Sequence, residues 1–322
     1  MEIFSINTVI IGAGAVGLAI ARELSLKGIE TLVLEREDHF GKITSSRNSG
    51  VIHAGIYYQT NSLKARFCVE GNQFIYQYCN EFNIPHRNTK KILVASNTEQ
   101  INIIDKIKEQ AEINGVKNIK KLSKKEVYKL EPLVNCEEAL LIPSSGIIDP
   151  ISFMRSLVGE IEEKGNTISY NSKVDKIFLD NDKFKILVKD FHENVTTINC
   201  KRLINSAGLF SSEVAKNIEG LDEKFIPKTY YAKGNYFSIN KNFGIHHLIY
   251  PIPDGFGLGS HLTLEMDNSI KFGPDVEWVE SPQDYAVDIS RKQTFIKEIR
   301  EYLPSIDTSL LTPAYAGIRP IT

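Results

Sequence analysis

The sequence has few cysteines, no strong excess of either charge and no long apolar segment. Only four of its 322 residues are cysteines, and they form neither a CxxC pair nor the spacing of a metal site. Reduced thiols and no metal site are therefore expected, which favours a cytoplasmic protein. No stretch reaches the ~18 apolar residues that a membrane span needs. The apolar run 8–11 follows Glu2 and has no basic segment before it, so we do not expect a signal peptide.

The charge balance and the length limit the class of protein further. Lysine plus arginine number 38 against 40 aspartates and glutamates, and no basic stripe stands out. Nucleic acid is therefore not an expected partner. At ~100–200 residues per domain, the length favours two domains and allows a large core.

The most informative feature present is a glycine-rich turn near the N-terminus. Gly12, Gly14 and Gly17 form a GxGxxG pattern directly after the apolar strand 8–11 and at the start of an apolar helix. The first glycine permits the tight turn, the second lets backbone N–H groups approach a pyrophosphate, and the third lets the helix pack closely on the strand. The helix N-terminus adds partial positive charge beside the phosphates.

A second predicted strand, 31–34, ends at an acidic residue, Glu35. Glu35 lies 21 residues after Gly14, close to the ~20-residue offset at which a carboxylate binds ribose hydroxyls. Strand, turn, helix, second strand and acid agree with one another. The sequence therefore predicts a Rossmann-like unit that binds an adenine dinucleotide.

The rest of the chain is predicted to mix helices and strands. Apolar spacing predicts helices over 62–82, 99–114, 150–164, 211–217 and 284–302. A capping-box pattern at Ser123 and Glu126 predicts one more helix. Alternating segments predict a β-meander over 167–170, 174–179, 184–189 and 195–198, with a separate strand at 202–205. Residues 41–61 are polar and contain glycine, and we expect a loop that lines the cofactor.

Several motifs resemble one family. The segments GAGAVG, LEREDHFGKITSSRNSGVIHAGIYY and SLKARFCVEG, and further along LIYP, GSHLT, FGP and YAGIRP, are similar to those of the FAD-dependent oxidoreductases of the D-amino-acid oxidase superfamily. Within it, the likeness is to the L-2-hydroxyglutarate dehydrogenase/oxidase group, and it covers nearly the whole chain. It implies an α/β (α+β) fold in which a Rossmann-like FAD-binding domain is interleaved with a β-rich substrate domain. The implied FAD-binding domain is 1–85, 143–225 and 303–322, and the implied substrate domain is 86–142 and 226–302.

The resemblance implies FAD as the cofactor. The residues implied for the pyrophosphate and ribose are Gly12, Gly14, Val16, Gly17, Glu35 and Arg36. The loop beside the isoalloxazine ring is matched by Thr44, Ser45, Arg47, Asn48, Ser49, Val51 and His53. Val174 matches a position whose backbone meets the adenine, and Ala207 and Gly208 match a strand end that the cofactor passes.

The implied reaction is oxidation of a 2-hydroxy acid, with L-2-hydroxyglutarate favoured, to the 2-oxo acid by hydride transfer to flavin N5. Arg319 in the GIRP motif resembles the family position where arginine grips a substrate carboxylate, and a guanidinium fork fits a carboxylate bidentately. The alternative for Arg319 is a surface arginine. Lys233 is a candidate for a second carboxylate, with an exposed turn lysine as its alternative.

Two histidines, His53 and His261, compete as the general base, because an imidazole titrates near neutral pH. Either one could instead only orient the flavin or the substrate. Tyr57 and Tyr250 are candidates for lining the substrate pocket, with core packing as the alternative. The metal-ligand set is predicted to be empty.

Two other functions stay open. One is an amino-acid or amine oxidase of the same superfamily, and the other is a truncated, non-catalytic dinucleotide-binding protein. The second arises because related enzymes continue beyond GIRP with a strand and a helix, whereas this sequence ends at Thr322. Expected partners are a small carboxylic-acid substrate and an electron acceptor, which could be a quinone, a carrier or oxygen. A transmembrane segment is not expected, and peripheral membrane contact stays open.

Overall fold

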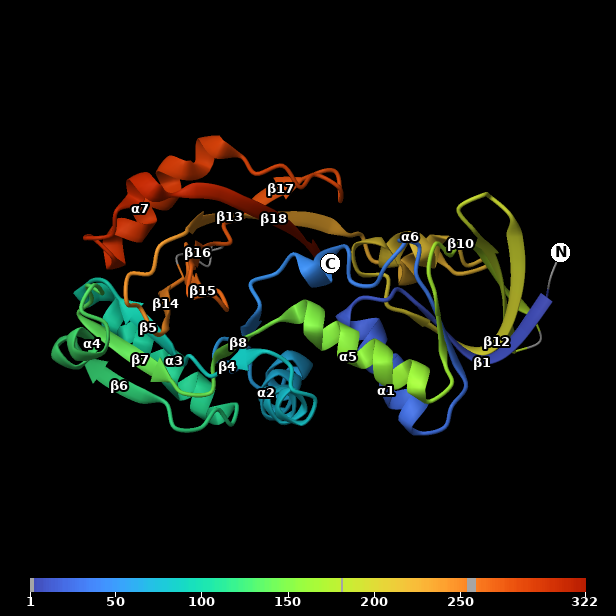
Figure 1. Ribbon diagram of the computed structural model, residues 1–322, viewed down its shortest axis with the longest axis horizontal. Helices are drawn as coiled ribbons and strands as arrows, with labels where there is room; N and C mark the ends of the chain where they lie inside the picture. Colours follow the sequence, from blue (N-terminus) through green and yellow to red (C-terminus); the bar gives the residue numbers. More distant parts are fainter. Residues whose placement is uncertain (1–2, 181, 254–258) are drawn as a thin grey trace.

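Two large β-sheets organise the chain into two lobes that meet near the middle of an elongated molecule (Figure 1). The computed structural model describes residues 3–180, 182–253 and 259–322. One lobe contains a six-stranded sheet and the other a nine-stranded sheet, and a three-stranded sheet accompanies them. This mixture of parallel and antiparallel pairing confirms the predicted α/β (α+β) fold.

The six-stranded sheet has its glycine-turn strand near the centre, in the order β10-β11-β12-β1-β2-β9. Its strands are β1 (Ile3–Ile11), β2 (Thr31–Leu34), β9 (Thr167–Ser169), β10 (Lys173–Asp180), β11 (Lys183–Lys189) and β12 (Val195–Asn205). β1 pairs in parallel with both β2 and β12, so the carboxyl ends of all three strands lie at one edge. That edge is where such sheets bind ligands.

Helices cover both faces of this sheet. Helices α1 (Ala15–Leu26) and α5 (Pro150–Glu163) lie side by side on one face (Figure 1), where Arg22 and Glu160 form an ion pair of 2.6 Å. Beneath them, Ile10, Leu18 and Met154 belong to one fully buried cluster. The short helix α6 (Ser211–Lys216) contributes Val214 to the cluster on the opposite face.

The nine-stranded sheet follows the order β17-β13-β16-β15-β14-β5-β7-β6, with β18 paired to β13. Its strands are β5 (Lys91–Ala95), β6 (Lys120–Ser123), β7 (Glu138–Ile142), β13 (Tyr230–Ile239), β14 (Leu248–Pro251), β15 (Leu262–Leu264), β16 (Ile270–Phe272), β17 (Glu277–Val279) and β18 (Thr312–Ile321). Its helices are α3 (Ile101–Ile113), α4 (Lys124–Leu130) and α7 (Lys292–Tyr302). Phe295 of α7 packs on Phe237 of β13 with ring centroids 4.7 Å apart, inside the largest buried cluster.

The smallest sheet and one long helix occupy the region between the lobes. The sheet has the order β3-β8-β4, formed by β3 (Val51–Ile52), β4 (His86–Arg87) and β8 (Gly146–Ile148). Helix α2 (Leu63–Glu81) begins where the Ser62 side chain accepts a hydrogen bond from the Ala65 N–H. The 3₁₀ helices are η1 (Thr44–Ser46), η2 (Thr98–Gln100), η3 (Gly208–Phe210), η4 (Glu223–Phe225), η5 (Ile289–Arg291) and η6 (Thr308–Leu310).

Local signals predicted every α-helix of the described ranges and the strands of the six-stranded sheet, and three of these predictions were wrong in bounds or pairing. The predicted strands 195–198 and 202–205 are one continuous strand, β12, because its whole length pairs with β1. Segment 167–170 is not part of the meander, since β9 pairs with β2 at the other edge of the sheet. The predicted helix 284–302 begins later: Asp284 holds a turn by accepting from the Ala286 N–H, and Asp288 caps η5, which leads into α7 at Lys292.

The predicted domain boundaries stay a prediction. The end of the chain is shared between the lobes: β18 pairs with β13 in the nine-stranded sheet, while Pro320 reaches the edge of the other lobe.

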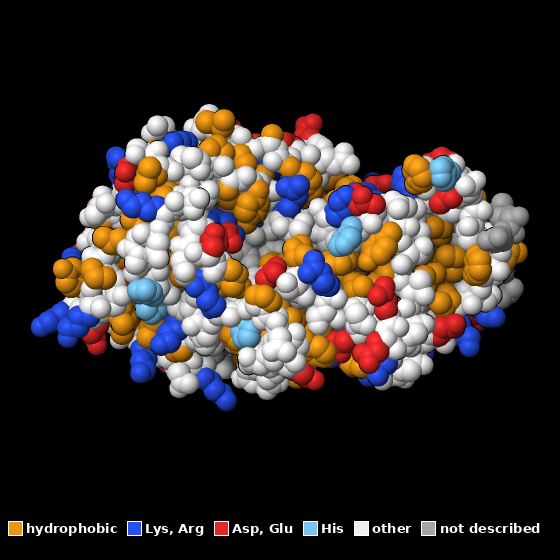
Figure 2. Space-filling view, in the orientation of Figure 1, with side chains coloured by type: hydrophobic (Ala, Val, Ile, Leu, Met, Phe, Trp, Pro, Cys, Tyr) orange, Lys and Arg blue, Asp and Glu red, His pale blue; other side chains and the backbone are white. Residues whose placement is uncertain are grey.

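Acidic and basic side chains are interspersed over the face in Figure 2. None of the helices in the described ranges is both long and apolar enough to cross a membrane.

Candidate active site

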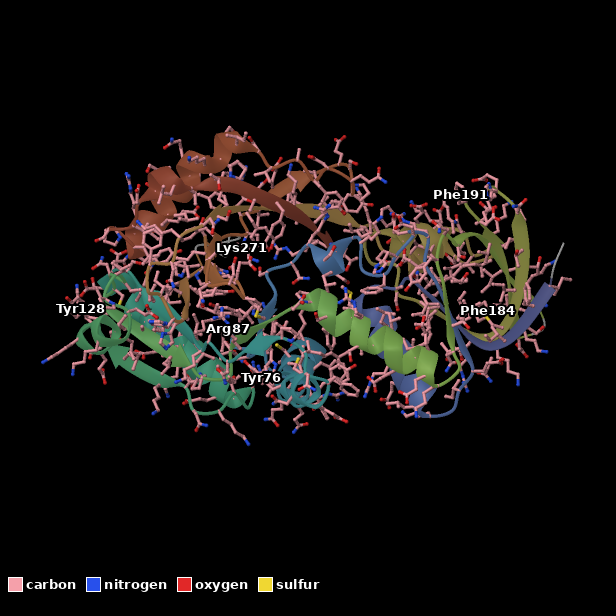
Figure 3. The ribbon with its side chains drawn as sticks, in the orientation of Figure 1. Tyr76, Arg87, Tyr128, Phe184, Phe191 and Lys271 are labelled. Atoms are coloured by element: carbon pink, nitrogen blue, oxygen red, sulfur yellow. The ribbon has the colours of Figure 1, made fainter. Side chains whose placement is uncertain are left out.

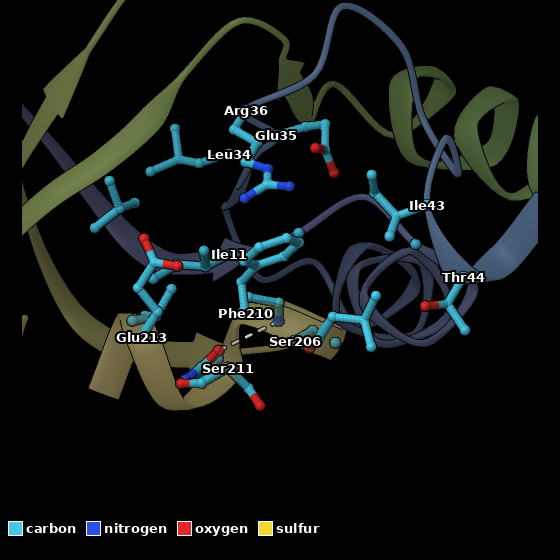
Figure 4. Close-up of a pocket in the computed structure, with 18 of the residues that line it drawn as sticks. Ile11, Leu34, Glu35, Arg36, Ile43, Thr44, Ser206, Phe210, Ser211 and Glu213 are labelled. Atoms are coloured by element: carbon cyan, nitrogen blue, oxygen red, sulfur yellow. Dashed lines mark hydrogen bonds between the residues drawn. The ribbon is translucent and has the colours of Figure 1, made fainter. Parts of the chain in front are cut away.

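A cavity of about 450 Å³ opens at the carboxyl edge of the six-stranded sheet, beside the glycine turn (Figure 4). Its walls come from the turn, the end of β2, the loop after it, the start of β10 and the segment after β12. Of the residues predicted to bind the cofactor, those that line it are Gly12, Gly14, Val16, Glu35, Arg36, Thr44, Ser45, Val174, Ala207 and Gly208. Gly17, Arg47, Asn48, Ser49, Val51 and His53 lie outside its lining.

Each glycine of the turn occupies its position for a different geometric reason. Gly12 has φ +102°, a conformation that L side chains rarely adopt. A Cβ on Gly17 would lie 2.0 Å from the Gly12 carbonyl oxygen, so only glycine lets α1 pack this close to β1. Gly14 is the N-cap of α1, and the Ala15 N–H behind it donates to Ser45 Oγ at 2.9 Å. The N-terminus of α1 therefore lies at the cavity, where Gly14 and Val16 line the wall and the helix end favours an anion.

Glu35 lies at the end of β2 and is 9% exposed. Its carboxylate accepts hydrogen bonds from the Ala13 N–H at 2.7 Å and from the Glu37 N–H at 3.0 Å. These bonds fix the carboxylate against the glycine turn at the wall of the cavity. Beside it, the Arg36 guanidinium lies 3.5 Å from the centre of the Phe210 ring, across the cavity in Figure 4.

The far wall of the cavity consists of exposed backbone. The β10–β11 register shifts between Val174 and Lys176, so the pairing is interrupted where Val174 lines the cavity. Gly208 has φ +54°, and nothing lies within 4 Å of the position a Cβ would take. A side chain there would project into open space, which suits close approach by a bulky ligand.

The loop 44–50, which begins at the cavity, is hydrogen-bonded to the nine-stranded sheet. The Tyr315 hydroxyl donates to the Asn48 carbonyl at 2.6 Å, and the Ser49 and Tyr236 hydroxyls are 2.9 Å apart. A Cβ on Gly317 would lie 2.0 Å from the Arg47 carbonyl oxygen, so the glycine of the GIRP motif permits this contact. Residues 44–50 thus connect the cavity to the second lobe.

One face of the nine-stranded sheet is apolar and the other carries polar groups. Strand partners across the sheet share the apolar face: Ile92, Phe237, Ile249, Leu262 and Phe272. Their chain neighbours therefore point to the opposite side. We call this side the polar face and define it by Lys91, Tyr236, Tyr250, His261, Lys271, Tyr315 and Arg319.

Contacts on the polar face link its members. The Tyr250 and His261 rings stack with centroids 3.6 Å apart, and the Lys91 ammonium lies 3.9 Å from the centre of the Tyr250 ring. Tyr236 and Tyr315 stack at 4.5 Å. Burial raises the pKa of Tyr236 to about 12, while the nearby Lys271 and Arg319 charges oppose that rise. Tyr250, His261 and Arg319, predicted separately, are therefore brought onto one surface.

Arg319, the predicted carboxylate clamp, lies near the end of β18. It is half-buried and shares its face of β18 with Tyr315 and Gly317, two and four residues earlier. Across the described ranges, no carboxylate pairs with its guanidinium. The next residue, Pro320, lines the cavity, so Arg319 lies where the cavity meets the polar face.

His53 and Tyr57 follow the loop 44–50, and they lie near Lys91 and Tyr250 of the polar face, respectively. Part of the His53 ring is accessible. Desolvation by the surrounding protein, together with the Lys91 charge, lowers the pKa of His53 far below 6.5. His53 is therefore a neutral imidazole at pH 7. The Tyr57 hydroxyl is buried and has no hydrogen-bond partner in the described part of the chain.

Lys233 does not join this group. It pairs in register with Ile318, so alternation directs Lys233 and Arg319 to opposite faces. Its ammonium contacts Asp284 at 2.9 Å and Glu277 at 3.1 Å. Burial lowers the pKa of Lys233, but these two carboxylates overcome that effect and raise it overall. The expected exposed-turn alternative also differs from the structure, since Lys233 is 2% exposed.

Two lysines of the polar face were not among the predicted site residues. Lys91 opens a strand whose other residues are apolar, and this lone charge was the only signal in the sequence. Lys271 forms an ion pair of 2.5 Å with Glu265 and helps line a smaller cavity of about 180 Å³ beside Ser49 and Tyr315. In Figure 3, Lys271 and Arg87 lie toward the middle of the molecule, and both contact Glu265.

The cavity and its surroundings fit a flavin adenine dinucleotide. The positive-φ glycine turn, the α1 N-terminus, the carboxylate at the end of β2 and the open backbone at Gly208 are what such a ligand needs. The loop 44–50 then leads from the cavity to the polar face. Among the described residues, no group of three or more His, Cys, Asp or Glu side chains could hold a metal ion.

Comparison with known proteins agrees with this class. The model of the family described as "FAD dependent oxidoreductase" (DAO) matches residues 7–322. The chain belongs to this family, and it is an FAD-dependent oxidoreductase.

Two curated relatives are informative about the kind of oxidoreductase. A mitochondrial L-2-hydroxyglutarate dehydrogenase of Arabidopsis thaliana is 41% identical over 98% of this chain and 73% of its own length. An L-2-hydroxyglutarate dehydrogenase of Indibacter alkaliphilus is 32% identical over 92% of this chain and 73% of its own length. The predicted cytoplasmic location stays a prediction.

Solved structures confirm the fold. L-α-glycerophosphate oxidase from Mycoplasma pneumoniae, solved reduced and with FAD bound, has a TM-score of 0.89 at 24% identity, covering 100% of this chain and 84% of its own. Glycine oxidase from Geobacillus kaustophilus has a TM-score of 0.82 at 17% identity, covering 99% and 84%.

Proposed function

We propose that this protein oxidises a 2-hydroxy acid, with L-2-hydroxyglutarate as the favoured substrate, to the 2-oxo acid. The proposal is supported by the Arg319 guanidinium, which lies at the junction of the cavity and the polar face and pairs with no carboxylate in residues 3–180, 182–253 and 259–322. A guanidinium fork binds a planar carboxylate through two parallel hydrogen bonds. The names of the Arabidopsis and Indibacter relatives support the five-carbon acid.

The cofactor residues proposed are those that line the cavity, with Gly17 acting through helix packing. Gly12, Gly14 and the α1 N-terminus would hold the pyrophosphate, and Glu35 the ribose. Residues 44–53 would run beside the flavin. When bound, FAD accepts the two electrons and the hydrogen that leave the hydroxyl-bearing carbon.

Arg319 would hold the carboxylate next to the reacting carbon and so fix which hydrogen points toward the cofactor. His53 would accept the hydroxyl proton. It is neutral at pH 7 and its ring is accessible, whereas His261 is 4% exposed and stacked against Tyr250. We therefore assign His261 to positioning Tyr250 and His53 to proton transfer.

A turnover assay with an artificial dye as electron acceptor tests the proposal. The panel is L-2-hydroxyglutarate, D-2-hydroxyglutarate, lactate and glycine, with 2-oxo acid product measured alongside dye reduction. Fastest turnover with L-2-hydroxyglutarate and one 2-oxoglutarate per two electrons is expected. Turnover with glycine alone would instead support an amino-acid oxidase, and FAD binding without turnover would support a non-catalytic protein.

A further inference from the structure

Lys91 differs from the other buried lysines. Three lysines are under 5% exposed: Lys91, Lys233 and Lys271. Lys233 and Lys271 both form ion pairs with carboxylates. Lys91 is 1% exposed, and no Asp or Glu in residues 3–180, 182–253 and 259–322 pairs with it. Its ammonium lies 3.9 Å from the centre of the Tyr250 ring, and its charge also acts on His53 and Cys68.

This arrangement is unfavourable for the protein alone. Burying an ammonium without a counter-charge costs several kcal/mol, and a cation–π contact contributes only about 0.5–2 kcal/mol. Burial accordingly lowers the pKa of Lys91 to about 7. Groups held in this way occur at functional sites, where a ligand supplies the missing partner.

Within the described part of the chain, the surroundings of Lys91 supply hydroxyl and thiol groups and no carboxylate. The buried Tyr57 hydroxyl lacks a partner among the described residues, and Tyr57 and Tyr250 are close enough to influence each other electrostatically. The Lys91 charge also reaches His53. The loop after β3, strand β5 and strand β14 therefore bring His53, Tyr57 and Tyr250 close to the Lys91 ammonium.

We propose that Lys91 binds the second, non-reacting carboxylate of the substrate and makes the site selective for dicarboxylates. The proposal rests on the proposed function, in which Arg319 holds the carboxylate beside the reacting carbon and His53 accepts the hydroxyl proton. The Lys91 ammonium donates a charge-assisted hydrogen bond to the distal carboxylate, and Tyr57 donates a second. Lys233, paired on the opposite face, has no part in it.

Binding of two inert acids to the FAD-loaded protein tests this without any turnover. Glutarate has a distal carboxylate and pentanoate has a methyl group in its place. Calorimetry should show that the native protein prefers glutarate. Lys91→Met should weaken glutarate binding on the order of 10²-fold and leave pentanoate within about twofold. Lys91→Arg should restore part of the preference.

Lys90→Met is the matched control, because Lys90 is the adjacent but exposed lysine. It should leave both affinities unchanged. Circular dichroism and retained FAD establish that each variant is folded. Equal losses for glutarate and pentanoate in Lys91→Met, or an unchanged preference, would overturn the assignment.

Kinetics separate this proposal from the proposed function. In Lys91→Met, kcat/KM for L-2-hydroxyglutarate should fall on the order of 10²-fold, mostly through KM, while L-2-hydroxypentanoate should be little affected. If the native protein oxidises L-2-hydroxyglutarate but Lys91→Met keeps its selectivity, only the role of Lys91 fails. If the native protein oxidises no 2-hydroxy acid, the proposed function fails, and the glutarate–pentanoate comparison still decides whether Lys91 binds a carboxylate.

Discussion

The dinucleotide cavity and the polar face are built in opposite ways. The motif beside the cavity consists of backbone features, namely a glycine turn, a helix N-terminus and an interrupted strand pairing, while side chains such as Leu34 and Phe210 complete the walls. The polar face consists of single side chains from strands far apart in the sequence, such as Lys91 and Arg319. Backbone groups can bind the pyrophosphate that all dinucleotides share, whereas separate side chains can change with the substrate.

We expect the largest effect at Gly17, which packs the helix beside the cavity against β1. Gly17→Ala places a Cβ 2.0 Å from the Gly12 carbonyl, so α1 must move off β1 and carry the phosphate-binding donors with it. We expect loss of bound FAD, measured as flavin absorbance per protein after gel filtration.

Gly71→Ala is the matched control, since Gly71 is also within a helix and nothing lies within 4 Å of its added Cβ. This variant should retain FAD and gain about 0.5–1 kcal/mol of stability. FAD retention by Gly17→Ala equal to that of Gly71→Ala would show that close helix packing is not required.

The next effect concerns the proton acceptor. His53→Asn should lower kcat by about 10²–10⁴-fold with FAD still bound, because a positioned base is lost. His261→Asn should have a smaller effect, exerted through the Tyr250 stack. His192→Asn, in an exposed turn, should have none. A larger loss in His261→Asn than in His53→Asn would reverse the assignment.

Arg319→Lys keeps the charge and removes the guanidinium fork. We expect kcat/KM for L-2-hydroxyglutarate to fall about 10- to 100-fold, because the bidentate geometry is lost. Arg300→Lys, on the exposed side of α7, serves as the control and should change nothing. Full activity in Arg319→Lys would mean that the fork does not hold the substrate.

The smallest effect is on stability and has a definite pH dependence. The pKa of Lys91 is about 7 in the folded protein and 10.5 when exposed, so between these values the unfolded chain binds more protons. The cost of burying Lys91 is thus fully present below pH 7 and declines as pH rises toward 10.5. Its neighbours that could titrate are His53, Cys68, Tyr57 and Tyr250.

Lys91→Met should therefore have a higher Tm than the native protein at pH 6, and the gap should shrink by pH 9. Each kcal/mol corresponds to roughly 2–4 °C. Lys90→Met should match the native protein at both pH values. A Tm for Lys91→Met below the native value at pH 6 would show that Lys91 stabilises the fold and is not held for a ligand.

The difference between local backbone motifs and side chains from distant strands also decides which features could be predicted from the sequence. Residue spacing within short segments predicted the glycine turn, Glu35 and helices such as α2, because local geometry determines these features. Lys233 and Lys91 look alike in sequence, and only strand register puts one against Asp284 and the other against Tyr250. The single strand β12 likewise needed its long-range pairing with β1 to be recognised.

The central claim is that the cavity and the polar face together form one oxidation site. Anaerobic addition of one equivalent of L-2-hydroxyglutarate to the FAD-loaded protein tests it most directly, by following the visible flavin band. Our account predicts that the band bleaches while one equivalent of 2-oxoglutarate forms. An unchanged flavin spectrum, with the substrate recovered intact, would contradict it.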